Sequence, residues 1–359
     1  MWTAAPTGMD PDEFAFDYDL LAELTEKSGV PGYEDRIREV VRREFEEHAD
    51  RVRSDAMGNV VGTVEGDSDY SVAVAAHMDE IGFMVRHVTD EGFVQLDALG
   101  GWDPRVLKAQ RVTVHTEDGD LTGVIGSVPP HTLDDPDEEP EVEDVHVDMG
   151  LPAGEVKDRV SPGDLVTMEQ STTAVGEHVT GKALDDRVCV FTMLEAARRI
   201  DDPEVTVHFA ATTQEEVGLR GARALGVDLD PDLAVALDVT VANDVPGFEP
   251  GDHVTELGDG AAIKLKDSSV ITNPKVHRRM KAVAGDEDID HQLEVLPAGG
   301  TDTAAFQNQF GAKPVGAISI PTRYLHTVTE SAHHADVAAA IDLLTAFLES
   351  ETGENDYTL

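Results

Sequence analysis

Residues 205–221 read Val-Thr-Val-His-Phe-Ala-Ala-Thr-Thr-Gln-Glu-Glu-Val-Gly-Leu-Arg-Gly. A short apolar run that is rich in β-branched residues and followed by glycine predicts a buried strand ending in a loop. Two adjacent carboxylates, Glu215 and Glu216, lie where this strand ends. Successive side chains of extended backbone diverge, so one carboxylate can bind a metal while the other acts as a base. Taken alone, the pair also fits a solvated acidic turn.

Segments of this kind alternate with helical patterns over most of the chain. We predict strands at residues 71–76, 205–213, 233–239 and 312–320, a hairpin at 54–65, and helices at 14–28, 33–53, 185–200, 275–284 and 336–349. Buried strands that alternate with helices are typical of a mixed, mostly parallel α/β sheet with helices on both faces.

The pattern changes between residues 84 and 172, where short alternating segments are separated by Gly, Pro and Asp turns. Such segments predict an inserted β-rich domain that resembles a barrel. The main domain is then discontinuous and comprises residues 1–83 and 173–359. Within the insertion, residues 134–144 are dominated by acidic side chains and contain two prolines, so we expect a solvated loop there.

The composition excludes several classes of partner. The chain of 359 residues has 72 acidic against 27 basic residues, a formal net charge of −45. We expect no nucleic-acid partner, because phosphate binding needs a basic patch. We expect no membrane partner either, because no apolar run approaches the roughly 20 residues of a transmembrane helix. The single cysteine, Cys189, lies in an apolar segment, which predicts a buried thiol and fits a reducing cytoplasm.

Candidate metal ligands follow the predicted strands. His77 comes directly after residues 71–76, the two glutamates follow residues 205–213, and Asp238 ends the strand that starts at Leu233. His326 follows the last predicted strand by six residues. In open α/β sheets, ligands bind outside the carboxyl ends of the strands, so these side chains are expected to converge.

Asp185-Asp186 enters a predicted helix, where exposed amide groups favour carboxylates. A mixed set of imidazoles and carboxylates suits Zn²⁺, Co²⁺ or Mn²⁺ better than Ca²⁺ or Mg²⁺. Each residue also has a simpler reading, such as a helix cap for Asp185 or a turn residue for Asp238. A second histidine pair, His333-His334, is expected to be exposed and not to bind metal.

Six motifs occur in this order along the chain: His77-Met78-Asp79-Glu80-Ile81-Gly82, Gly181-Lys182-Ala183-Leu184-Asp185-Asp186-Arg187, Thr213-Gln214-Glu215-Glu216-Val217-Gly218, Asp238, Gly299-Gly300-Thr301-Asp302 and Arg323-Tyr324-Leu325-His326. Together, over essentially the whole chain, they resemble the tetrahedral (TET) metallo-aminopeptidases, a family that includes glutamyl and leucyl aminopeptidases. The resemblance implies a zinc-peptidase type of fold, a cytoplasmic enzyme and an insertion that mediates dimerisation. It further implies that the dimers assemble into a dodecamer.

The resemblance also implies roles for single residues. Five residues would bind two divalent metal ions, with Asp185 bridging the two ions: His77, Asp185, Glu216, Asp238 and His326. Glu215 would be the general base, and Asp79 would orient His77 without binding metal. The Asp185–Asp186 peptide bond is expected to be cis, as in related enzymes.

Physical chemistry supports such a mechanism. Two metals a few ångströms apart can share a hydroxide, lower its pKa and polarise the carbonyl of the peptide bond that is cut. Glu215 would take the proton of the water and pass it to the leaving amine of the peptide substrate. Asp79 would hold the tautomer of His77.

Two other functions stay open from the sequence. A related dinuclear amidohydrolase would act on N-acyl amino acids, and it would need a basic residue for the substrate carboxylate, for which Arg220 and Arg323 are available. A non-catalytic acidic protein would instead bind cations loosely, without stoichiometry. Cleavage of free aminoacyl substrates distinguishes the first alternative, and a stoichiometric transition metal distinguishes the second.

The acidic composition resembles that of proteins from halophiles and generates a prediction about salt. Like charges on the surface repel one another over a Debye length of about 10 Å at 0.1 M salt and only about 3 Å at 1 M. The temperature of unfolding should therefore rise between 0.1 M and 1 M KCl, as measured by differential scanning fluorimetry. A temperature of unfolding that stays constant or falls would contradict this reading of the surface charge.

Overall fold

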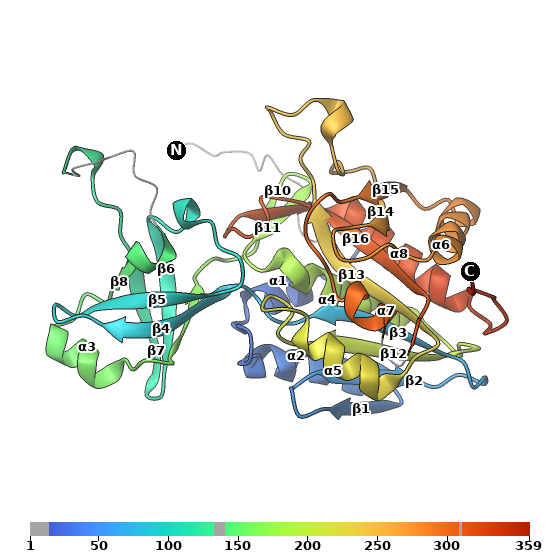
Figure 1. The fold of residues 1–359 in the computed structure, drawn as a ribbon, viewed down its shortest axis with the longest axis horizontal. Helices are drawn as coiled ribbons and strands as arrows, with labels where there is room; N and C mark the ends of the chain where they lie inside the picture. The colour runs from blue at the N-terminus through green and yellow to red at the C-terminus, as the bar shows by residue number, and fades with distance from the viewer. Residues whose placement is uncertain (1–13, 133–140, 309–310) are drawn as a thin grey trace, which may run out of the picture.

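The computed structural model describes residues 14–132, 141–308 and 311–359. A large α/β body carries a small barrel at its side (Figure 1). The described part of the chain has these helices: α1 (Tyr18–Glu26), α2 (Asp35–His48), α3 (Ala153–Arg159), α4 (Leu184–Arg199), α5 (Arg220–Leu229), α6 (Pro274–Asp286), α7 (Thr303–Gln307) and α8 (His334–Glu349). None of the helices in these ranges combines the length and apolar character that crossing a bilayer requires.

The large sheet has eleven strands within the described residues. They are β1 (Arg51–Ser54), β2 (Val60–Val64), β3 (Ser71–His77), β10 (Thr173–Val175), β11 (His178–Gly181), β12 (Thr206–Thr212), β13 (Leu233–Val241), β14 (Ala261–Lys266), β15 (His291–Val295), β16 (Val315–Arg323) and β17 (Glu330–His333). Their order is β1-β2-β12-β3-β13-β16-β17-β11-β10, and β14 and β15 branch from β16.

The expected mostly parallel sheet is only partly confirmed. The central strands β12, β3, β13 and β16 pair in parallel, and so do β14 and β15. The other pairings are antiparallel, at the hairpin β1–β2, at β2–β12, at β14–β16 and along β16-β17-β11-β10. The parallel centre follows from the helical connections between its strands, whereas short turns join the hairpin strands in opposite directions.

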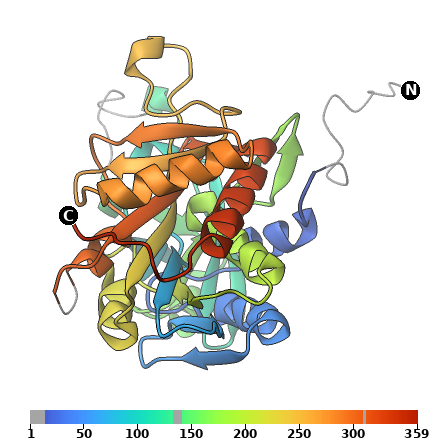
Figure 2. The same cartoon turned by 90° about the vertical axis from the view of Figure 1, so that its right-hand side faces the viewer.

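Helices cover both faces of the sheet, as predicted. On β3, alternate residues face opposite sides: Val72 and Val74 belong to one apolar cluster, and Ala73 and Ala75 belong to the other. Helices α1, α2, α4, α6 and α8 contribute to the first cluster, and α5 and α7 to the second. Figure 2 shows α6 and α8 side by side, and both helices contact β14. Cys189 is fully buried in the first cluster, as expected.

The inserted segment forms a closed barrel, in the order β4-β5-β8-β7-β6-β9. Its strands are β4 (Gly82–Val88), β5 (Phe93–Leu99), β6 (Gln110–Thr116), β7 (Gly119–Ile125), β8 (His146–Asp148) and β9 (Leu165–Met168). A separate apolar cluster fills it. Closure removes the exposed strand edges that an open small sheet would have. Most of the acidic loop predicted at 134–144 lies outside the described residues, and its end forms a short 3₁₀ turn at Val142–Asp144.

Several predicted boundaries were wrong. The helix expected at 33–53 ends at His48, because residues 51–54 pair with β2 as an edge strand. The alternating arginines of that strand resemble the charged face of a helix in the sequence. The helix expected from residue 14 begins at Tyr18, where the side chain of Asp17 accepts a hydrogen bond from the backbone N–H of Leu20.

Candidate metal centre

A cavity of about 410 Å³ lies at the edge of the sheet, and the residues lining it include six of the seven predicted site residues. These six are His77, Asp185, Glu215, Glu216, Asp238 and His326. The seventh, Asp79, is fully buried and lies outside the lining. The structure therefore brings together side chains that are up to 249 residues apart in the sequence (77 to 326).

The register of the parallel strands explains this convergence. Thr212 of β12 pairs with His77 of β3, and Ala236 of β13 pairs with Ala75. Asp238 therefore lies level with His77 on the neighbouring strand. The sequence suggested that Asp238 ends its strand, but β13 continues to Val241.

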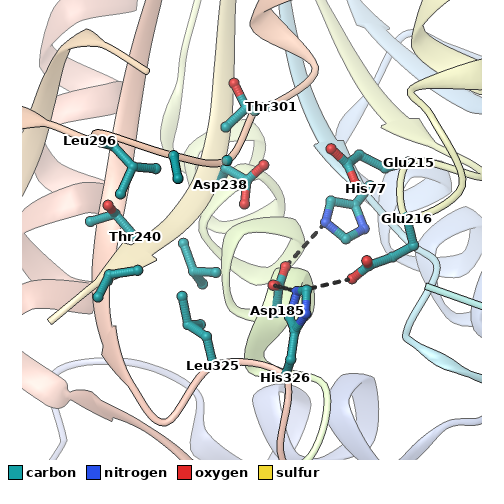
Figure 3. Close-up of a pocket in the computed structure, with 15 residues that line it drawn as sticks. His77, Asp185, Glu215, Glu216, Asp238, Thr240, Leu296, Thr301, Leu325 and His326 are labelled. Carbon is teal, nitrogen blue, oxygen red and sulfur yellow. Dashed lines mark hydrogen bonds and ion pairs between the residues drawn. The ribbon is translucent and has the colours of Figure 1, made fainter. Parts of the chain in front are cut away.

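Asp185 is at the centre of the cluster (Figure 3). Its Oδ1 lies 3.2 Å from Nε2 of His77, and its Oδ2 lies 3.4 Å from Nε2 of His326. Nε2 of His326 also lies 3.9 Å from Oε1 of Glu216. The backbone at Asp185 departs from helical geometry at the start of α4, and the Asp185–Asp186 peptide bond is cis, as expected. Asp185 thus presents one oxygen to each histidine.

Two sets of three ligand atoms share this aspartate. One set comprises His77, Asp185 and Asp238, and the other comprises Asp185, Glu216 and His326; within each set the ligand atoms lie within 4.8 Å of one another. Glu215 belongs to neither set, although it lines the same cavity. The donor types, two imidazoles and three carboxylates, fit transition-metal ions such as Zn²⁺.

Electrostatics agrees with a site for cations. Burial raises the pKa of Asp238 well above its ordinary value, and the charge of Asp185 raises it further. Burial likewise raises the pKa of Glu216 to about 8, with a further contribution from Asp185. The cause is an excess of carboxylates in a volume that water screens poorly, and bound cations would balance that charge. Within the described residues, no hydrogen bond occupies the carboxylate of Asp238.

Asp79 contacts His77, the residue that it was expected to orient, and it also contacts the turn after β12. Its carboxylate lies 3.6 Å from Nδ1 of His77, while its backbone carbonyl accepts the closer contact at 3.0 Å. The carboxylate also accepts the backbone N–H groups of Glu215 at 3.0 Å and Glu216 at 3.1 Å. Asp79 thereby holds the whole turn after β12.

Glu330, a buried residue at the start of β17, was not among the predicted site residues. Its Oε2 accepts the backbone N–H of Asp185 at 3.0 Å, and its Oε1 accepts that of His326 at 2.8 Å. One carboxylate therefore joins the two backbone segments that carry these two side chains. No motif marks this residue, because its partners are backbone groups that only the fold brings together.

The barrel also reaches the site. The backbone carbonyl of Gly101 accepts a hydrogen bond from Nδ1 of His326 at 2.7 Å, which leaves Nε2 free to face Asp185. A Cβ atom at Gly101 would lie 3.1 Å from the same nitrogen, so a side chain there would crowd the ring. In the sequence, the adjacent glycines Gly100 and Gly101 were the signal that the backbone here closely approaches another group.

We predicted that His333 and His334 are exposed, but both side chains are half-buried. Their rings stack on each other, and His334 also stacks on Phe14. Nδ1 of His333 accepts the backbone N–H of Ala335 at the start of α8. With Glu177 they form a third possible set of ligands, but the positive end of a helix dipole disfavours a cation there.

Imidazoles and carboxylates gathered at the edge of a mixed α/β sheet form an arrangement suited to a metal-dependent enzyme. The model of the M42 glutamyl aminopeptidase family matches residues 58–343, and the chain belongs to this family of metal-dependent peptidases. A lysyl aminopeptidase from Pyrococcus furiosus is 35% identical over 350 residues, which cover 95% of this chain and 99% of the relative. The chain is therefore a peptide hydrolase of the aminopeptidase class.

Solved structures share the fold over nearly the full length. An aminopeptidase from Desulfurococcus kamchatkensis superposes with a TM-score of 0.90 at 37% identity, covering 94% of this chain and 95% of that one. The TET1 peptidase of Pyrococcus horikoshii, which can assemble into a tetrahedron or a large octahedral shell, gives 0.84 at 34% identity and covers 93% and 99%. The combination of sheet and barrel is thus that of the TET peptidases.

The position of Glu330 leads to a testable prediction. In Glu330→Gln, one acceptor oxygen becomes an NH₂ group that must face a backbone N–H, so one of the two hydrogen bonds is lost. We expect metal affinity and kcat/KM to fall about 10- to 100-fold. Metal affinity is measured by competition with a chelator, and kcat/KM with an aminoacyl substrate.

The matched control is Glu351→Gln, at a buried glutamate that contacts Tyr357 and Asn355 and lies outside the cavity. This control should leave metal affinity unchanged. Equal metal affinity in Glu330→Gln and the parent would contradict the assigned role.

Proposed function

We propose that this chain is an aminopeptidase that removes N-terminal residues from short peptides with two divalent metal ions. The observation that carries the proposal is the pair of ligand sets that share Asp185 within one cavity. In this proposal, His77 and Asp238 would hold one ion, Glu216 and His326 would hold the other, and Asp185 would contribute an oxygen to each. The donor set favours Zn²⁺ or Co²⁺, with Mn²⁺ as a further candidate.

Bound here, the two ions would lower the pKa of a water molecule and polarise the carbonyl of the peptide bond that is cut. The cluster of carboxylates offers a negative environment for the substrate's α-ammonium group. A free N-terminus is thus favoured over a blocked one, which makes the enzyme an exopeptidase.

Glu215 is proposed as the general base. It lines the cavity without belonging to either ligand set, and burial raises its pKa well above the ordinary value. Its carboxylate would accept the proton of the attacking water and deliver it to the leaving amine as the peptide bond breaks. Asp79 is proposed to position this base through the backbone N–H of Glu215.

The alternative of an N-acyl amino acid deacylase has less support. That reaction needs a basic side chain to hold the substrate carboxylate. Arg323 is already paired with Asp244 at 2.6 Å, and neither Arg323 nor Arg220 lines the cavity. A non-catalytic cation-binding protein would need no such enclosed arrangement of ligands.

We also propose that the chain forms dimers that assemble into a dodecamer. Support comes from the similarity to P. horikoshii TET1, for which a dodecamer is described. The proposed units are a catalytic domain of residues 1–83 and 173–359 and a dimerisation domain of residues 84–172. Support for such a division comes from the barrel strands, which run from Gly82 to Met168. The lone buried Cys189 supports a location in the reducing cytoplasm.

The proposed reaction is tested by comparing aminoacyl amides with the corresponding N-acetyl amino acids in 1 M KCl. We expect turnover of free aminoacyl substrates that chelation abolishes and that Zn²⁺, Co²⁺ or Mn²⁺ restores. Elemental analysis should give two metal ions per chain. Exclusive cleavage of N-blocked substrates would reject the aminopeptidase proposal, and the absence of bound transition metal would favour the non-catalytic alternative.

The two adjacent glutamates should respond differently to the same change. Glu215→Gln should retain both metal ions and lose kcat about 10²- to 10⁴-fold, because only the proton acceptor is removed. Glu216→Gln should lose metal, because an amide is a weaker ligand than a carboxylate. Glu349→Gln, at an exposed position, serves as the control. A Glu215→Gln variant that hydrolyses as fast as the parent would refute the assignment of the base.

A further inference from the structure

The cavity has two unlike halves (Figure 3). The candidate ligands gather on one side, and Leu296, Thr240 and Leu325 lie toward the other. The aliphatic residues that line it are Val239, Val241, Leu296, Ala298 and Leu325. Val239 and Leu296 are only 5% and 9% exposed, so they form a packed wall, while Val241, at 37%, lies nearer the opening.

We propose that this aliphatic half binds the side chain of the substrate's N-terminal residue and selects an uncharged aliphatic side chain, such as that of leucine or methionine. The inference rests on the aminopeptidase function proposed above. A substrate with its α-amine and first carbonyl at the carboxylate cluster must direct its first side chain into the remaining part of the cavity. That part has apolar walls, which favour side chains that leave water readily.

Charged side chains find no counterpart there. Among the described residues, every charged or imidazole group in the lining belongs to the ligand cluster or is Glu215, the proposed base. The nearby cations are engaged elsewhere: Arg323 pairs with Asp244, and the fully buried Lys264 pairs with Glu294 at 2.6 Å. A glutamate side chain would thus lose its hydration without gaining a cation, and a lysine would gain no free carboxylate.

Thr240 also lines the cavity, although its side chain points away from those of its neighbours Val239 and Val241 on the extended strand β13. Its side chain is 1% exposed, and its hydroxyl has no hydrogen-bond partner within the described residues. A single hydroxyl does not neutralise a carboxylate or an ammonium group. The hydroxyl therefore leaves the preference for uncharged side chains in place.

Family membership does not decide this selectivity, because the family is named for glutamyl cleavage and one relative is a lysyl aminopeptidase. The net charge of −45 and the apolar wall favour different substrates. The charge attracts cationic peptides at low salt, whereas the wall favours aliphatic side chains. This long-range attraction falls with the Debye length, from about 10 Å at 0.1 M salt to about 3 Å at 1 M. Contact with the apolar wall does not weaken in the same way.

The inference is tested with fluorogenic leucyl, methionyl, alanyl, glutamyl and lysyl substrates, each measured at 0.1 M and 1 M KCl with the metal-loaded enzyme. At 1 M KCl, kcat/KM for leucyl should exceed that for alanyl at least about tenfold, because each added methylene contributes in an apolar pocket. The leucyl kcat/KM should also exceed the glutamyl and lysyl values about 100-fold. The ratio of lysyl to leucyl turnover should fall as salt rises.

A substitution in the apolar wall tests whether its residues set the preference for the substrate's first side chain. Val241→Asp adds a carboxylate at the half-open side of the cavity and should raise the lysyl-to-leucyl ratio of kcat/KM at least about tenfold. Val241→Asn adds polarity without charge and should not raise it. Val175→Asp makes the same change of charge on β10, at an exposed position outside the cavity, and should leave the ratio unchanged.

The two proposals fail in different ways. If no free aminoacyl substrate is cleaved, the aminopeptidase function itself fails. If glutamyl or lysyl substrates are cleaved faster than leucyl at 1 M KCl, the aminopeptidase function stands and the apolar selectivity is overturned. An equal effect of Val175→Asp and Val241→Asp on the lysyl-to-leucyl ratio would also overturn the assigned wall.

Discussion

The structure depends on the parallel pairing of β12, β3 and β13 in one register. That pairing sets His77 and Asp238 level on neighbouring strands and starts the Glu215-Glu216 turn beside them. A slip of one residue would turn every side chain of a strand to the opposite face. Both faces of β3 are buried under different helices, so such a slip would exchange the residues of two packed cores. Packing thus protects the geometry of the metal centre.

Buried carboxylates have a second use around this centre, as acceptors for backbone amides. Asp79 holds the amides of Glu215 and Glu216, and Glu330 holds those of Asp185 and His326. Asp186 adds a contact of the same kind, because its Oδ2 accepts the backbone N–H of His77 at 3.1 Å. Each of these carboxyl groups satisfies backbone N–H groups at or near the end of a helix or strand and thereby fixes that segment. The ligand-bearing side chains are therefore held through their backbones.

Negative charge acts in two different ways in this protein. On the surface, dissolved salt screens it, so its effect on stability and on encounter with substrates depends on conditions. In the cavity, the carboxylates of Asp185 and Asp238 are buried, so bound cations or protons are needed to balance them. The same cavity also has an apolar half in which charge is absent, so attraction of the α-amine and selection of the side chain are separated in space. The carbonyl of Gly101, from the barrel, links the insertion to the charged half.

The sequence by itself determined the class of fold, the inserted barrel and the residues that gather in the cavity, because strand periodicity, glycine turns and six ordered motifs are local patterns. It did not determine the antiparallel run β16-β17-β11-β10 or the end of α2 at His48, since strand pairing depends on distant partners. Only the tertiary structure identified Glu330 and the backbone role of Asp79. Only it showed the aliphatic wall, because β13 and the segment around Leu296 face each other through folding alone. Side chains that act through backbone groups or through shape leave no spacing signal along the chain.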